Sequence, residues 1–220
     1  MDFPKFYSLL RTSQLYFPSA NVLHLVDPFE GSLPRREYDN MLKRMNRDSI
    51  VRAAQNFREN TLISCWHFND AESVAMWKIY SQLGNGIVIS TSFSDFKDAF
   101  EEAEEDVYAG KVIYVDYNEH VFYQGEKDFP TGLNVFMYFI HKRSIYRGEQ
   151  EYRAVISTLN STGLNTTGKF IKVSLPKLVR DVVLSPESPQ WMLELTNSVL
   201  GDHLPSVKAH FSSFHEQPIV

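Results

Sequence analysis

The sequence predicts an α+β fold: one domain over residues 1–220, with a central mixed or antiparallel sheet flanked by helices. Helix-like and strand-like segments alternate along the chain, but they do not form the repeated strand–helix–strand units of a doubly wound fold. The length suits a single domain, and no repeat, low-complexity tract or Pro/Gly-rich linker divides it. Phe and Tyr are abundant, and aromatic side chains bury enough area for a substantial core.

The first half of the chain is assigned from the spacing of apolar residues and from β-branched runs. Helices are expected at residues 3–10, 37–60 and 69–80. Asn69 and Asp70 would cap the third of these helices, and the glycines of residues 84–86 would end it. Strands are expected at residues 15–18, 61–68 and 86–92. The Asp-Pro and Gly-Ser pairs within residues 26–32 predict a turn that Asp27 shapes.

The second half continues the alternation of helices and strands. A helix should begin at residues 94–96 and end in the solvated acidic run 101–106, and further helices are expected at residues 134–141 and 189–200. Strands are expected at residues 107–117, 153–159, 169–175 and 207–211.

The charge balance and the chain start favour a cytoplasmic protein that does not enter a membrane. Acidic residues exceed basic ones, 27 to 22, which disfavours non-specific attraction to nucleic acids or anionic lipids. No apolar run is long enough to span a bilayer. The N-terminal residues lack the basic start and apolar core of a signal peptide.

Cysteine usage fits a reducing compartment, because a single cysteine cannot form an intramolecular disulfide. Cys65 lies in an apolar, strand-like run, where a buried structural cysteine is favoured over a catalytic thiol. Cys65 and His67 share a strand face, but no second pair follows at ligand spacing. We therefore expect no metal. Nor does a Gly-rich phosphate loop occur, so phosphate contacts would have to come from side chains.

The most informative stretch is residues 143–155, which is dense in charge. Glu149 and Glu151 are one residue apart, so on a strand both would point to the same face. Two like charges repel unless cations or a substrate compensate them. A functional site and a solvated turn laced with ion pairs both remain open here. As a site, it should be one cleft formed by Glu149, Glu151, Lys142, Arg143, Arg153, Trp77, Tyr80 and Ser90.

Three groups of short motifs carry a family resemblance. They are Leu15-Tyr16-Phe17-Pro18 with Asp27-Pro28-Phe29-Glu30-Gly31; Cys65-Trp66-His67 with residues 76–80 and 86–89; and residues 110–117 with Lys142-Arg143 and residues 149–153. Together with the tail at residues 175–191, they resemble the bacterial family catalogued as domain of unknown function 2971. The resemblance covers almost the entire chain and implies a role in defence against phage or in stress. Relatives usually carry a strand with an arginine ahead of the position equivalent to Met1, and this sequence departs from that pattern.

A second resemblance, at the level of motifs, concerns chemistry. Ser90-Thr91-Ser92 and Glu149-Gln150-Glu151 are similar to the Ser-Thr-Ser strand and the Glu-x-Glu turn of ADP-ribosyltransferases. The first element of these enzymes is an arginine on an early strand, which here would be Arg11. This resemblance implies NAD as a substrate and a protein or nucleic acid as acceptor. Glu151 would stabilise the oxocarbenium-like ribose and Glu149 would position the acceptor. Around them, Ser90 would support the ribose, Trp77 or Tyr80 would stack on nicotinamide, and Arg143 or Arg153 would contact the diphosphate.

The alternative function is a non-catalytic module that binds a nucleotide, a peptide or a phage component. An enzyme needs a cleft near the glutamates that excludes water. A binding module would instead show an exposed apolar patch or a symmetric self-interface, as in a homo-oligomer. Trp77 also has a simpler explanation, because an aromatic residue on a helix with Met76 is most often part of a core.

Overall fold

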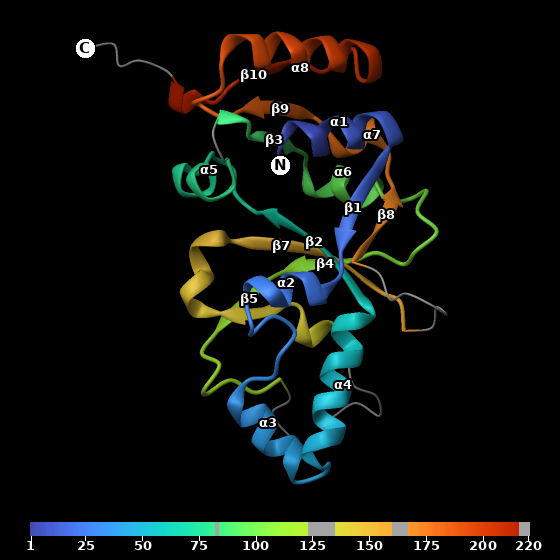
Figure 1. Cartoon of the computed structure of the whole chain (residues 1–220), viewed down its shortest axis with the longest axis vertical. Helices are drawn as coiled ribbons and strands as arrows, with labels where there is room; N and C mark the ends of the chain where they lie inside the picture. The colour runs from blue at the N-terminus through green and yellow to red at the C-terminus, as the bar shows by residue number, and fades with distance from the viewer. Residues whose placement is uncertain (82–83, 123–134, 160–166, 216–220) are drawn as a thin grey trace, which may run out of the picture. The chain divides into compact units, whose positions relative to one another are not determined.

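The structure is a computed structural model that describes residues 1–81, 84–122, 135–159 and 167–215. It confirms the α+β class, since helices and mostly antiparallel strands interleave along the chain (Figure 1). Within the described residues the strands pair in several small sheets, so the expected central sheet is divided. No helix in this part of the chain is long and apolar enough to cross a bilayer.

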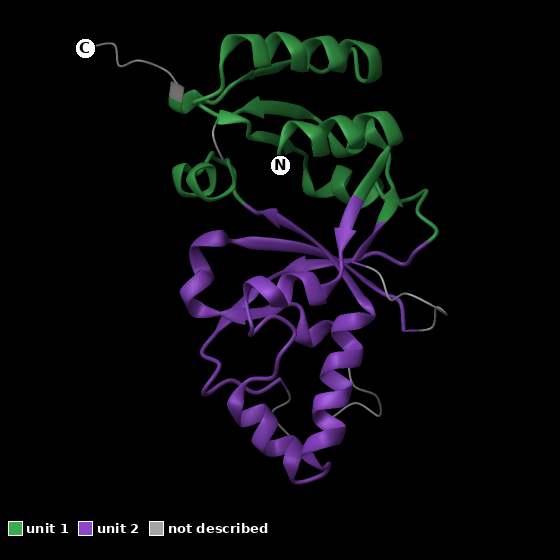
Figure 2. Cartoon of the chain, viewed as in Figure 1, with its two compact units in different colours: residues 1–15, 69–104, 170–220 green, residues 16–68, 105–169 purple. Residues whose placement is uncertain are grey.

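The contacts group the chain into two compact units (Figure 2). Unit 1 comprises Met1–Leu15, Asn69–Glu104 and Phe170–Val220, and unit 2 comprises Tyr16–Phe68 and Glu105–Lys169. Strands β1 (Gln14–Pro18) and β8 (Gly168–Lys172) pair with each other, and along each of them the chain passes from one unit into the other. One domain over residues 1–220 stays a prediction.

Unit 1 is built on a three-stranded sheet of β10 (Ala209–Phe211), β9 (Asp181–Leu184) and β3 (Ile87–Ser90), in that order. Strand β9 is antiparallel to β3 and parallel to β10. This central strand is apolar, and Val182 and Leu184 on it are fully buried. The first helix begins at Asp2, whose carboxylate accepts the Lys5 backbone N–H, and ends at Ser13 in the left-handed conformation. The elements of unit 1 are α1 (Phe3–Thr12), α5 (Val74–Tyr80), β3 (Ile87–Ser90), α6 (Phe93–Asp98), α7 (Leu175–Leu178), β9 (Asp181–Leu184), α8 (Gln190–His203), β10 (Ala209–Phe211) and η4 (Ser213–His215).

Unit 2 carries the antiparallel sheet β2-β7-β4 and a parallel pair, β5-β6. In the register of β2 and β7, Ile63 lies opposite Val155 and His67 lies opposite Glu151. The elements of unit 2 are α2 (Ala20–Val26), α3 (Arg35–Leu42), α4 (Arg47–Glu59), β2 (Thr61–His67), β4 (Tyr108–Lys111), β5 (Ile113–Val115), η2 (Val135–Tyr138), β6 (His141–Arg143), η3 (Ser144–Glu149) and β7 (Glu151–Ser157).

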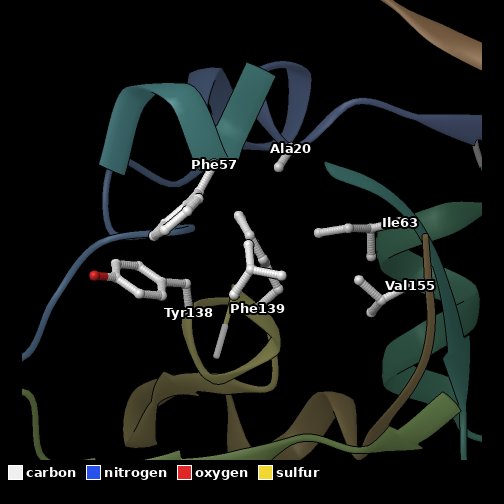
Figure 3. Close-up of a cluster of buried hydrophobic side chains, with 7 residues drawn as sticks. Ala20, Phe57, Ile63, Tyr138, Phe139 and Val155 are labelled. Atoms are coloured by element: carbon white, nitrogen blue, oxygen red, sulfur yellow. The ribbon is translucent and has the colours of Figure 1, made fainter. Parts of the chain in front are cut away.

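A cluster of buried apolar side chains forms the core of unit 2 (Figure 3). Phe139 is fully buried at its centre, and the rings of Phe57 and Tyr138 meet edge to face at 5.0 Å. Ile63 and Val155 bring the face of the β2–β7 sheet to this cluster. Because side chains alternate along a strand, the same face continues into Cys65 and His67 on β2 and into Arg153 and Glu151 on β7. One sheet face therefore passes from apolar core to charged site.

Two expected helices are different in the structure. The helix predicted over residues 37–60 is divided into α3 and α4, and Asn46 caps the second by accepting the Ser49 backbone N–H. The helix predicted from Asn69 and Asp70 begins only at Val74, with Ser73 as its N-cap, and it ends at Tyr80. Local capping decided both boundaries, and apolar spacing alone does not reveal it.

The predicted strand over residues 107–117 breaks at Val112 because the chain changes partners there. The Val112 backbone N–H donates to Glu151 on β7, whereas the Ile113 N–H donates to Ile140. The helix predicted over residues 134–141 was wrong: the short 3-10 helix η2 is followed by strand β6, which pairs with β5. Residue 134 itself lies outside the described residues.

Strand β3 and helix α6 are shorter than predicted. The strand ends at Ser90, because Ser92 caps α6 by accepting the Asp95 backbone N–H. The helix ends at Asp98, before the acidic run, in which Glu102 pairs with Lys172 at an exposed position.

The turn after α2 requires glycine at position 31. Gly31 has φ of +65°, and a Cβ there would lie 2.6 Å from the Phe139 ring and 2.8 Å from Cγ of Arg58. We predict that Gly31→Ala lowers the free energy of unfolding by about 2 kcal/mol or more, through backbone strain and this clash. Gly110→Ala is the control, since a Cβ there meets nothing within 4 Å. Equal urea midpoints for the two variants would contradict this account.

Candidate functional site

Five charged side chains of unit 2 form a continuous series of ion pairs, which we call the charge network. Arg153 binds Glu30 with two nitrogens, at 2.6 and 3.0 Å, and its Nε donates to Glu151 at 2.7 Å. Lys142 Nζ then donates to both Glu151 and Glu149, at 2.5 Å each. Three carboxylates thus face two cations, and the network keeps a net negative charge.

The members of the network come from four separate segments of unit 2. Glu151 and Arg153 alternate on β7 and so point to one face, whereas Glu30 lies in the turn after α2. Lys142 is on β6. Glu149 is the last residue of the 3-10 helix η3.

The predicted reason for the convergence of the two glutamates was wrong. They do not share a strand, because Gln150 between them adopts the left-handed conformation with φ of +42°. This residue turns the chain from η3 into β7, and both carboxylates reach Lys142 across the turn. The convergence itself is present, with Lys142 as the shared partner.

Burial decreases along the network. The Arg153 side chain is 1% exposed, that of Glu151 7% and that of Glu149 18%. Arg153 also donates to the backbone carbonyl of Phe139 at 2.7 Å, which ties the buried end to the apolar core. The accessible end is therefore Glu149.

The two glutamates have pKa values shifted in opposite directions. Burial alone would raise the pKa of Glu151, but Arg153 and Lys142 outweigh it and hold that pKa well below its usual range. Burial and the neighbouring Glu151 carboxylate raise the pKa of Glu149. Burial opposes the charge of Lys142 as well, yet the two carboxylates keep its pKa raised and the side chain protonated.

Arg143 forms a second cluster next to the network. Its guanidinium pairs with Asp27 at 3.0 Å and lies 4.0 Å from the centre of the Phe29 ring, and its Nε–H donates to no acceptor among the described residues. Tyr146 contacts both cations, since its hydroxyl accepts from Arg143 at 3.2 Å and its ring lies 4.5 Å from Lys142 Nζ. Asp27 also accepts the Phe29 backbone N–H, which confirms its predicted role in the turn.

Three of the predicted site residues belong to unit 1. Trp77 is buried and its indole N–H donates to Glu72 at 2.8 Å, as expected of a core residue. Tyr80 is exposed, and Ser90 ends β3 opposite Asp181. Their convergence with the glutamates of unit 2 stays a prediction.

Sequence reasoning missed several neighbours of the network. Glu30 is buried against Arg153, the Tyr114 hydroxyl accepts the Glu151 backbone N–H at 2.7 Å, and a His67 ring nitrogen lies 2.7 Å from the Glu149 carbonyl oxygen. A buried arginine on a strand requires a buried carboxylate, which is a usable signal. Sequence spacing does not tell which carboxylate it is.

Cys65 was expected to be buried but is exposed on β2, in register with Arg153. Desolvation still raises the pKa of its thiol to about 12, which opposes the thiolate form that a catalytic cysteine needs. Among the described residues, no three His, Cys, Asp or Glu side chains are grouped so that they could hold a metal ion.

Comparisons of the chain with protein-family models, with curated proteins and with solved structures found no match. The two resemblances therefore stay predictions. The function is therefore inferred from the geometry of unit 2.

We predict that Arg153→Met destabilises the fold strongly. It leaves Glu30 and Glu151 buried with one partner fewer, and breaking a buried pair costs about 3–5 kcal/mol of unfolding free energy. Arg36→Met is the control, because Arg36 pairs with Glu119 on the surface and should contribute under about 1 kcal/mol. Chemical denaturation of both variants gives the comparison, and a small loss for Arg153→Met would contradict the role of the network.

The opposite pKa shifts predict opposite effects on acid stability. The pKa of Glu151 is lower in the folded state, so its contribution is present above about pH 4.3 and is lost as the pH falls below that value. The raised pKa of Glu149 has the opposite effect, because its contribution to stability is present at low pH and is lost as the pH rises. Glu151→Gln should therefore flatten the loss of stability between about pH 5 and 2, and Glu149→Gln should steepen it. Denaturant unfolding across this pH range measures both slopes, and equal slopes would refute the assignment.

Proposed function

We propose that unit 2 cleaves the N-glycosidic bond of a nucleotide, with NAD as the substrate, and passes the ADP-ribosyl group to water or to an acceptor. One observation carries the proposal: two carboxylates with opposite pKa shifts meet at one lysine, in a network that keeps net negative charge. Pairs of carboxyl groups with separated pKa values are typical of acid–base sites.

The reaction needs negative charge where the ribose becomes positive. As the bond from C1′ of the ribose to nicotinamide breaks, nicotinamide leaves with the electron pair and C1′ becomes oxocarbenium-like. Glu151 stays ionised beside Arg153 and Lys142, so it is suited to stabilise this cation. The third carboxylate of the network keeps the total charge negative despite the two cations.

Glu149 is suited to act on the acceptor. Burial and the neighbouring Glu151 raise its pKa, which makes it the stronger base of the pair. In the proposed step an acceptor hydroxyl or water attacks C1′ and its proton passes to Glu149. Both carboxylates lie 2.5 Å from Lys142 Nζ, so these two oxygens are at most about 5 Å apart and can act at the same ribose carbon.

Arg143 is the proposed contact for the diphosphate. Its side chain is 27% exposed, and its Nε has no hydrogen-bond partner among the described residues. A planar guanidinium suits phosphate oxygens, and the rings of Phe29 and Tyr146 hold it in place. The proposal does not depend on Trp77, Tyr80 or Ser90.

The test is incubation of the purified chain with NAD carrying a label on the adenylate moiety, with and without cell extract. Released nicotinamide and label transferred to protein or nucleic acid are measured. We predict that Glu151→Gln and Glu149→Gln each lose about 10²-fold or more in rate, since each removes a group that acts in the transition state. Glu119→Gln is the control, because this exposed glutamate pairs only with Arg36 among the described residues.

The measurement also separates the rival function. Lys142 already compensates both glutamates, an arrangement that would equally suit a rigid binding surface. NAD binding without turnover, unchanged in Glu151→Gln, would favour the non-catalytic module. If calorimetry detects no NAD binding and no label is transferred, the proposal is refuted.

A further inference from the structure

Unit 2 holds a pocket of about 410 Å³ that no member of the charge network lines. The turn after α2, helices α3 and α4, and the residues after β5 enclose it. This volume is in the range of sites for small organic molecules. The residues of its lining that matter here are Phe29, Arg35, Ile50, Ala54, Arg58 and Tyr117.

Arg58 is the unusual residue of this pocket. It lies on α4, is only partly exposed, and forms no ion pair within the described part of the chain. Its Nε is buried without a hydrogen-bond partner, and among the described residues the guanidinium makes one long hydrogen bond, of 3.4 Å to the Gly31 carbonyl. Burial lowers its pKa, as expected for a cation that is desolvated without an adequate counter-charge. A guanidinium in this state favours an anion.

The remaining wall is apolar and aromatic. Phe29 and Tyr117 meet edge to face at 5.6 Å, and Ile50 and Ala54 on α4 contribute the aliphatic part. Arg35 also lines the pocket and is a second cation. Among the described residues, its side chain forms an ion pair only with Asp39, at 3.2 Å and exposed to solvent. None of the described residues that line the pocket carries a carboxylate. The lining therefore repels no anion and offers a surface for a planar, apolar body.

We propose that this pocket binds a small organic anion with a planar apolar body, its phosphate or carboxylate paired with Arg58. The body lies against Phe29 and Tyr117, and Arg35 closes on the anionic group from the rim. This site is separate from the carboxylates Glu149 and Glu151, and it does not require that unit 2 turns over NAD.

Calorimetry with two matched pairs of probes tests the proposal. One pair is adenosine 5′-monophosphate against adenosine, and the other is indole-3-carboxylate against indole. We expect at least one anion to bind, about tenfold or more tightly than its neutral partner. The first pair reports a phosphate ligand and the second a carboxylate ligand.

Three variants locate the binding. Arg58→Met should weaken it about tenfold or more, whereas Arg52→Met, an exposed arginine on the same helix, should leave it unchanged. Ala54→Leu fills the pocket while keeping a good helix former, and it should also abolish binding. Glu151→Gln should retain binding, which separates this result from the NAD test. The proposal is overturned if neither anion binds, if the neutral partners bind as well, or if Arg58→Met binds normally.

Discussion

The buried guanidinium of Arg153 is the interaction on which unit 2 depends. It joins the turn after α2 through Glu30, the start of β7 through Glu151, and the end of η2 through the Phe139 carbonyl. A desolvated cation is unfavourable unless every partner is in place. Glu30 lies 123 positions from Arg153 in sequence, so the pairing makes the positions of this turn and of β7 interdependent. The same side chain joins the apolar cluster to the charged half of the sheet face.

From that fixed point the network becomes progressively more accessible. Glu151 is held between two cations at the buried end, while Glu149 shares only Lys142 and lies nearer to solvent. The difference in their pKa shifts follows from this position and not from their chemistry, which is identical. The proposed division of roles between the two glutamates rests on this difference in burial and in pKa.

Local signals predicted much of the fold. Apolar spacing predicted the helix at residues 3–10 and the strand at residues 61–68, and the charge density at residues 143–155 pointed to the network, whereas strand β9 was not predicted. Some failures were local, at helix boundaries set by the Asn46 and Ser73 caps, and others were non-local. The exchange of partners at Val112 and the pairing of β6 with β5 depend on hydrogen bonds between distant segments. Glu30 was missed as the partner of Arg153 for the same reason, since 123 positions separate them. No periodicity within a window encodes such a contact.

The left-handed Gln150 has a consequence for how this turn can vary. Its side chain makes no hydrogen bond that the geometry of the site requires, but its backbone sets the angle at which η3 enters β7. Gly and Asn adopt this conformation at little cost, whereas Val and Ile do not. Substitution of Gln150 is therefore limited by the backbone conformation, and substitution of Glu149 or Glu151 is limited by the charge that the network needs. Substitutions in this three-residue turn are thus constrained in two independent ways.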